Sequence, residues 1–424
     1  METVLILAFI GMALIGVPVA YALALSVSLV LFVYMDLPQV LIVNNLFSGI
    51  DSFSFMAVPF FMLAGAFMSA GGVTSRLVNV AQAMVGSFTG GLAQAVAVAG
   101  MFFAAISGSS AATTAAIGST MVNEMEQKGY KREMATGIVA AAGTVGIVIP
   151  PSITFVVYGV IANVSIGDLF MAGVLPGLIM GGVMCAMGWY LAKKNKIPPE
   201  GNFSCVKLAK AIKDAFWALM TPVIIIGGIY SGIFTPTEAA AVAAVYGIVV
   251  GLFVYRELSI KDFPQIIFKA VIGTTLIMFL VGASKIFGWL MTNLQIPHMV
   301  GQAVTDFTSS PILFLLIMNV LLLVLGTLVN ASAAVVILTP IFLPVALTMG
   351  IDPIHFGVVM VMNLAIGCIT PPVGLDLFVA SAITKVPLEK VMKATMPYLL
   401  ALLAALVCIT MTPAVSTTLP YLFK

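Results

Sequence analysis

AIGCITPPVG, residues 365–374, places a threonine, two prolines and a glycine inside an otherwise apolar run. A second double proline, Pro150 and Pro151, follows a glycine in TVGIVIPPSI, residues 144–153. Proline removes a backbone donor and clashes with the carbonyl four residues back, so each stretch should interrupt a helix. We therefore expect two broken helices, over residues 133–161 and 354–384.

The composition assigns the chain to a class. It has 424 residues, of which 61% are hydrophobic and 8% charged, and its mean hydropathy is +1.17. Soluble proteins carry about 25% charged residues, and apolar runs of about 18 residues, long enough to span a bilayer, recur along this chain. We expect an all-α polytopic membrane protein in contact with lipid. A net charge of +2 gives no reason to expect a nucleic-acid partner.

One offset relates the two halves of the sequence. Pro150 and Pro371 are 221 residues apart, and the same offset aligns LFVY at 31–34 with LFVY at 252–255. Self-similarity at a fixed offset indicates an internal duplication. We expect a first repeat over residues 1–192, a basic cytoplasmic linker over 193–214 and a second repeat over 215–424.

Charge and segment length predict the topology. Basic residues favour the cytoplasmic side, and placing every basic cluster there gives the halves opposite orientations, an inverted-topology repeat. Segments 92–122 and 312–347 are interrupted by SGSS and GTLVNASA. Their arms, of about 15 residues, reach roughly 22 Å, less than the hydrocarbon core of about 30 Å. We expect two re-entrant helical hairpins; two full spans with a kink are the alternative.

The interruptions supply ligands for a small cation. Irregular backbone at membrane depth occurs where it is buried in protein or lines a cavity, and its carbonyls are hard oxygen donors. Side chains could complete two symmetric shells: Ser107, Ser109, Ser110, Thr144 and Ser152 in the first, and Asn330, Ser332, Asn363 and Thr370 in the second. The alternative is that these small residues serve only helix packing.

Three charged residues lie in apolar surroundings. Glu238 suits the first turn of a helix capped by Thr235. Lys285 either snorkels, pairs with a carboxylate or faces a transport path, and Asp376 could flank the second shell. Without an arginine-lined pocket, an anionic substrate would depend on the N-termini of the hairpin helices.

SGSSAATTAAIGSTM, GTVGIVIPPS, TPTEAA and GIDPIHFGVVMVMNLAIGCITPPVG resemble the large membrane subunit of tripartite ATP-independent periplasmic (TRAP) transporters, over essentially the whole chain. The resemblance implies the ion-transporter superfamily fold, with a scaffold and a mobile elevator domain. It also implies sodium as the coupling ion, with ligands among Ser107, Ser109, Gly143, Gly146, Pro150, Gly326, Asn330, Gly367, Thr370 and Val373. We expect the substrate at Ser109, Ser110, Thr144, Ser152, Ser332, Asn363 and Pro371.

The resemblance further implies uptake of a carboxylated solute, of the C4-dicarboxylate or sialic acid class, across the bacterial inner membrane. Its partners would be a small four-helix membrane subunit and a periplasmic substrate-binding protein. A stand-alone sodium- or proton-coupled carboxylate transporter is the alternative. A passive channel and an intramembrane enzyme with a nucleophilic Ser107 or Ser109 are further alternatives. The enzyme would need a base at hydrogen-bond distance, and both histidines lie near predicted helix ends.

Overall fold

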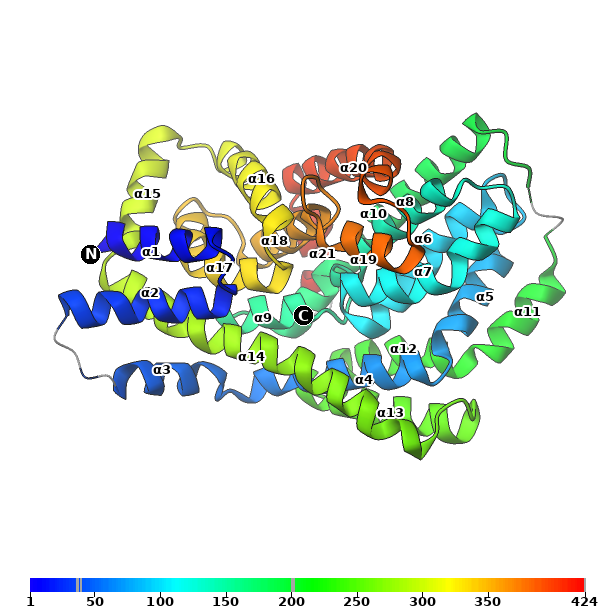
Figure 1. Cartoon of the computed structure of the whole chain (residues 1–424), viewed down its shortest axis with the longest axis horizontal. Helices are drawn as coiled ribbons and strands as arrows, with labels where there is room; N and C mark the ends of the chain where they lie inside the picture. Colours follow the sequence, from blue (N-terminus) through cyan, green and yellow to red (C-terminus); the bar gives the residue numbers. More distant parts are fainter. Residues whose placement is uncertain (36–37, 39, 200–202, 423–424) are drawn as a thin grey trace.

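The computed structural model describes residues 1–35, 38, 40–199 and 203–422, and within these ranges every regular element is a helix (Figure 1). In the part of the chain that the structure describes, seven helices are long and apolar enough to cross a membrane, or up to eight if the bent pair of α11 and α12 forms one span. The predicted class, an all-α polytopic membrane protein, is confirmed. The first half contains α1 (Glu2–Leu14), α2 (Val19–Tyr34), α3 (Val40–Ile50), η1 (Phe53–Met56), α4 (Ala57–Ala70), α5 (Val73–Val85), α6 (Gly91–Ser107), α7 (Ser110–Gln127), α8 (Arg132–Gly143), η2 (Thr144–Ile147), α9 (Ile153–Ala162) and α10 (Ile166–Lys194).

The second half repeats this order after the linker. It contains α11 (Cys205–Asp214), α12 (Phe216–Tyr230), α13 (Pro236–Val249), η3 (Val250–Val254), η4 (Ile260–Asp262), α14 (Phe263–Asn293), α15 (Ile296–Phe307), α16 (Pro311–Leu328), α17 (Ala331–Thr348), α18 (Pro353–Gly367), α19 (Leu375–Thr384), α20 (Leu388–Met411) and α21 (Ala414–Leu422). The expected linker, 193–214, is partly helical, because α11 occupies its second part. Residues 200–202 of that linker lie outside the described residues.

Side-chain caps fix where several helices begin. Ser109 accepts a hydrogen bond from the Ala112 N–H at the start of α7, and Ser152 accepts one from the Phe155 N–H at the start of α9. Such caps satisfy backbone donors that have no partner within the helix. The predicted cap of α13 is present as a capping box, in which Thr235 and Glu238 each bond the other's backbone N–H.

Both expected broken helices are interrupted at the double prolines. α8 ends at Gly143, and regular α-helix resumes only at Ile153 in α9. α18 ends at Gly367 and α19 begins at Leu375. The Pro150–Pro151 and Pro371–Pro372 peptide bonds are both cis. The two breaks thus present short stretches of non-helical backbone inside the protein.

The two segments expected to form hairpins each consist of two helices around a short break. α6 and α7 have 17 and 18 residues, and α16 and α17 have 18 each. These arms are longer than the expected length of about 15 residues, because helix continues to the caps at both ends. α16 and α17 are each long enough to be candidate spans, so the re-entrant arrangement stays a prediction.

Helix starts recur at the offset read from the sequence. α7 begins at Ser110 and α17 at Ala331, and α8 begins at Arg132 and α18 at Pro353. The repeated elements also exchange partners, since α7 packs on α19 while α9 packs on α17. α14 lies against α2, α3 and α4 and forms a long wall beside this assembly (Figure 1).

Candidate functional site

A cavity of about 350 Å³ lies where the breaks between paired helices meet. We call residues 107–110, between α6 and α7, the first tip, and residues 326–330, between α16 and α17, the second tip. Both tips line the cavity with the start of α9, and α14 closes one side. Its lining is Met62, Gly108, Ser109, Ser110, Ala111, Ile147, Ile153, Thr154, Gly273, Leu276, Ile277, Leu280, Asn330, Ala331, Ser332, Ala333, Cys368 and Leu375.

Two helix N-termini face this cavity. α7 begins at Ser110 and α17 at Ala331, and both residues are part of the lining. The first backbone N–H groups of a helix have no partner within the helix, and the helix dipole places partial positive charge there. Two such ends at one cavity favour an anion. No charged side chain lines it among the described residues.

The first tip is bonded to the first break. The Ile153 N–H donates to the Gly108 carbonyl at 3.4 Å. Within the tip, the Thr113 hydroxyl donates to the Ser109 carbonyl at 2.8 Å and lies 3.0 Å from the Ser107 hydroxyl. Three oxygens therefore converge beside the break, among them those of the predicted ligands Ser107 and Ser109.

Glycines let the first tip approach the first break closely. A Cβ on Gly146 would lie 2.5 Å from the Thr113 Oγ1, and one on Gly143 would collide with the Thr114 hydroxyl. The buried Thr114 Oγ1 has no hydrogen-bond partner among the described residues. An unpartnered buried oxygen is rare and leaves a hard ligand free, which fits a small cation. Thr113 and Thr114 were not among the predicted ligands, although the sequence ATT follows the first tip directly.

The second tip meets the second break in the same way. A Cβ on Gly367 would lie 2.7 Å from Gly326 Cα, and the Gly374 N–H donates to the Thr327 carbonyl at 3.1 Å. The predicted ligand Thr370 uses its hydroxyl on the Ile366 carbonyl at 2.9 Å. Asn330 accepts from the Ser332 N–H at 2.9 Å and caps α17.

The helix that follows each tip also contacts the broken helix of the other half. Thr154, at the start of α9, lies 3.3 Å from the Ser332 hydroxyl. Asp376 is fully buried in the first turn of α19, close to Ser110 at the start of α7, and neither of its carboxyl oxygens has a hydrogen-bond partner among the described residues. Sequence reasoning placed Asp376 beside the second shell, and packing of α19 on α7 brings it to the first tip.

Six other predicted residues lie apart from the cavity lining. Thr144 and Ser152 are buried and donate to the Ala141 and Ile147 carbonyls. The Asn363 amide nitrogen donates to the Asn319 side-chain oxygen at 2.8 Å, in a buried network that does not line the cavity. Pro150, Pro371 and Val373 are part of the breaks themselves, and Pro150 is buried while the other two are half-buried.

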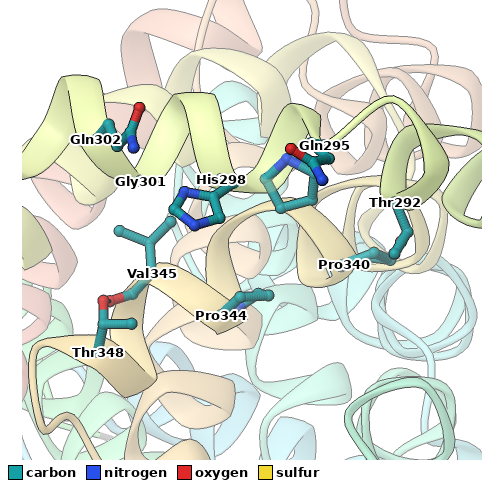
Figure 2. A pocket seen from close by; sticks show the side chains of 10 residues that line it. Thr292, Gln295, His298, Gly301, Gln302, Pro340, Pro344, Val345 and Thr348 are labelled. Atoms are coloured by element: carbon teal, nitrogen blue, oxygen red, sulfur yellow. The ribbon is translucent and has the colours of Figure 1, made fainter.

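Neither of the two histidines lies beside the serines of the first tip. Among the described residues there is no group of three or more His, Cys, Asp or Glu that could hold a metal ion. His355 is buried, and its Nδ1 lies 2.6 Å from the Ser416 hydroxyl. His298 lines a separate pocket of about 510 Å³ between α15 and α17 (Figure 2). Neither imidazole lines the cavity that holds Ser109, as a serine nucleophile would require.

The chain is similar to proteins of one transporter family. The family described as "Tripartite ATP-independent periplasmic transporter, DctM component" matches residues 6–415. The isethionate TRAP transporter permease protein DctMQ of Oleidesulfovibrio alaskensis is 46% identical over 95% of this chain, which spans 63% of that relative's length. The C4-dicarboxylate TRAP transporter large permease protein DctM of Pseudomonas aeruginosa is 46% identical over 89% of this chain and 88% of its own. The Alcanivorax borkumensis YdaH transporter structure superposes with a TM-score of 0.60 at 16% identity, covering 87% of this chain and 86% of that one, which shows the fold alone.

Proposed function

This chain belongs to the DctM component family of tripartite ATP-independent periplasmic transporters, and from that premise we propose that it imports a carboxylated solute by coupling to sodium. It is a permease subunit of the inner membrane and not an enzyme. Subunits of this family work with a small membrane subunit and a substrate-binding protein. The solute proposed here is a C4-dicarboxylate, a sialic acid or a related organic anion.

The observation that carries this proposal is the cavity bounded by two helix N-termini and by tips that contact broken helices. The N-termini provide positive partial charge for a carboxylate. Hydroxyls and freed carbonyls at the breaks provide hard oxygen ligands. Sodium is a hard cation and, like calcium and magnesium, prefers such ligands. One site thus offers complementary ligands for an anion and its coupling ion.

In the proposed mechanism, sodium is a co-transported substrate. The oxygens of Ser107, Ser109 and Thr114 would hold it at the first break, with Gly326, Asn330 and Thr370 around the second. The substrate carboxylate would bind between the tips at Ser110 and Ser332. The paired helices α6–α9 and α16–α19 would then move as an elevator past α14, whose contribution to the cavity, Gly273, Leu276, Ile277 and Leu280, is apolar.

Thermal unfolding tests sodium binding. The purified chain, with its small membrane subunit, is titrated with NaCl against choline chloride at constant ionic strength. A ligand at 100 times its Kd stabilises the folded state by about 2.7 kcal/mol, so a saturable, sodium-specific rise in the unfolding midpoint is expected. Ser109→Ala and Asn330→Ala should weaken it, whereas Ser119→Ala, an exposed serine elsewhere on α7, should not. A response to pH with no response to sodium would instead support proton coupling.

A second experiment tests the tripartite organisation. Proteoliposomes containing the chain and its small subunit are assayed for uptake of labelled succinate, isethionate and N-acetylneuraminate, with and without the substrate-binding protein. We expect uptake only when the binding protein is present. Uptake by the permease alone at the same rate would favour the stand-alone carboxylate transporter.

A further inference from the structure

A second cavity, of about 790 Å³, lies next to the first along α14. The α14 residues that line the central cavity are Gly273, Leu276, Ile277 and Leu280, and those that line the second are Val281, Ser284, Lys285, Gly288, Trp289, Thr292 and Asn293. From Leu276 to Asn293 these positions form adjacent pairs that recur every four residues, so they make one continuous stripe that winds slowly round the helix. The two cavities therefore succeed each other along the same stripe of α14.

The wall opposite α14 also runs from one cavity to the other, and α9 forms it. α9 contributes Ile153 and Thr154 to the central cavity and Val160 and Ile161, followed by Asn163, to the second. Its 10 residues span about 15 Å. One short helix thus reaches from one cavity to the other, opposite the stripe of α14.

The second cavity differs from the first in charge. Its polar lining includes Ser48, Ser52, Asn163, Ser284, Thr292 and Asn293, and among the residues that the structure describes Lys285 is the one charged residue in the lining of either cavity. The hydroxyls of Ser48, Ser284 and Thr292 each donate their one proton to a backbone carbonyl of their own helix. The Lys285 ammonium, with three donors, is therefore the group in this lining best suited to bind a carboxylate.

Lys285 has no carboxylate partner among the described residues. The ion pairs found there join Arg76 to Glu257, Arg132 to Glu126 and Lys390 to Glu133. Lys285 lies within α14, which has 31 residues and is one of the candidate spans. An ionised side chain within a span is costly, and such residues mark substrate or ion pathways.

The root of the lysine side chain is held in place. A Cβ on Gly49 would lie 2.8 Å from the Lys285 Cβ, so α3 closes on α14 at this point. Gly49 lines the same cavity. The close approach fixes where the side chain leaves the helix, while its ammonium end remains available to the cavity.

We propose that Lys285 binds the carboxylate of the transported organic anion in this second cavity, on the way to the central site. The inference rests on the proposed function and adds a specific cationic contact to it. An anion would first meet a formal charge at Lys285 and then pass to the helix N-termini at the tips. The contact with Lys285 should strengthen the capture of the substrate and have little effect on the rate of its translocation.

The experiment uses the complete transporter in proteoliposomes, with the binding protein and whichever of labelled succinate, isethionate or N-acetylneuraminate the wild type takes up. A hydrogen bond to a charged group contributes about 1.5–3 kcal/mol, and about 1.4 kcal/mol corresponds to a tenfold change in affinity. Lys285→Gln should therefore raise KM about tenfold with little change in maximal rate. Lys285→Arg should stay within about threefold of the wild type. Lys269→Gln, an exposed lysine on the same helix, is the matched control and should have no effect.

A charge-rescue arm separates anion binding from packing. Lys285→Cys is made in a background in which the exposed cysteines, Cys205 and Cys408, are serine, and that background alone is the control. Aminoethylation by a methanethiosulfonate restores an ammonium group and should restore KM, whereas the sulfonatoethyl reagent should not. Equal effects of the two reagents, or an unchanged KM in Lys285→Gln, would overturn the assignment while leaving the proposed function standing. A wild type that takes up none of the three anions would overturn both.

Discussion

Replacing Gly146 with alanine tests whether the first tip and the first break form a cation site. The new Cβ would lie 2.5 Å from the Thr113 Oγ1 and 2.7 Å from the Ser109 carbonyl oxygen, and real Cβ contacts essentially never fall below 3.0 Å. The Thr113 hydroxyl must therefore move by about 0.5 Å and the Ser109 carbonyl of the tip by about 0.3 Å, a typical response to an overpacked site. Because Ser109 O belongs to the backbone, a side-chain rotation cannot relieve the whole overlap.

The expected magnitude follows from that overlap. Overpacking costs about 1–3 kcal/mol, and about 1.4 kcal/mol corresponds to a tenfold change in affinity. If the cost falls on the cation-bound arrangement, the sodium concentration that gives half of the rise in unfolding midpoint should increase about fivefold or more. The assay is the titration with NaCl against choline chloride described above.

Two further alanine variants make the test specific. Gly367→Ala applies the same perturbation to the second tip, because its Cβ would lie 2.7 Å from Gly326 Cα, and it should also weaken the sodium response. Gly182→Ala, in α10, would meet no atom within 4 Å and should leave the response unchanged. A folded Gly146→Ala protein with the wild-type sodium titration would refute the reasoning.

Three other predictions concern buried polar groups. Thr114→Val removes a hydroxyl that has no partner among the described residues, so the protein should keep its unfolding midpoint in choline but gain less from sodium; a normal gain would exclude Thr114 as a ligand. Asp376→Asn removes a fully buried carboxyl whose oxygens have no hydrogen-bond partner among the described residues; because an unpaired buried charge is destabilising, the variant should unfold at a higher temperature than the wild type, by a margin that grows as the pH is raised, and a lower midpoint would mean that the charge is compensated. Asn319→Ala leaves Asn363 and Thr410 without their partner and should reduce the free energy of unfolding by about 2 kcal/mol, measured by denaturant titration with unchanged sodium dependence; a neutral effect would show that this network does not stabilise the fold.

The breaks could be predicted from the sequence because proline and glycine act through local backbone chemistry. The double prolines at 150 and 371 interrupt their helices wherever the chain folds, and the capping signal at Thr235 and Glu238 is equally local. The lengths of the arms were less predictable, since helix α7 continues to Gln127 through polar residues that an apolar pattern would exclude.

The composition of the site depended on contacts between distant segments. Asp376 reaches Ser110 only because α19 packs on α7, a pairing that no local pattern encodes. Asn363 is the opposite case. Its position close to a break suggested a ligand, but its amide donates to Asn319 on another helix. Periodicity identifies which residues are near a break, and tertiary packing decides which way they face.

The exchanged packing also bears on where the anion resides during transport. Polar groups of the central cavity, among them Ser110, Thr154 and Ser332, belong to the tips and broken helices, whereas α14 presents an apolar face to it. In the proposed elevator, an anion bound at the tips would therefore leave with them, since sliding along α14 breaks no hydrogen bond. Lys285 belongs to α14 and would stay behind. A contact that is released before the movement cannot stabilise the moving state, so its loss should weaken capture and spare the maximal rate.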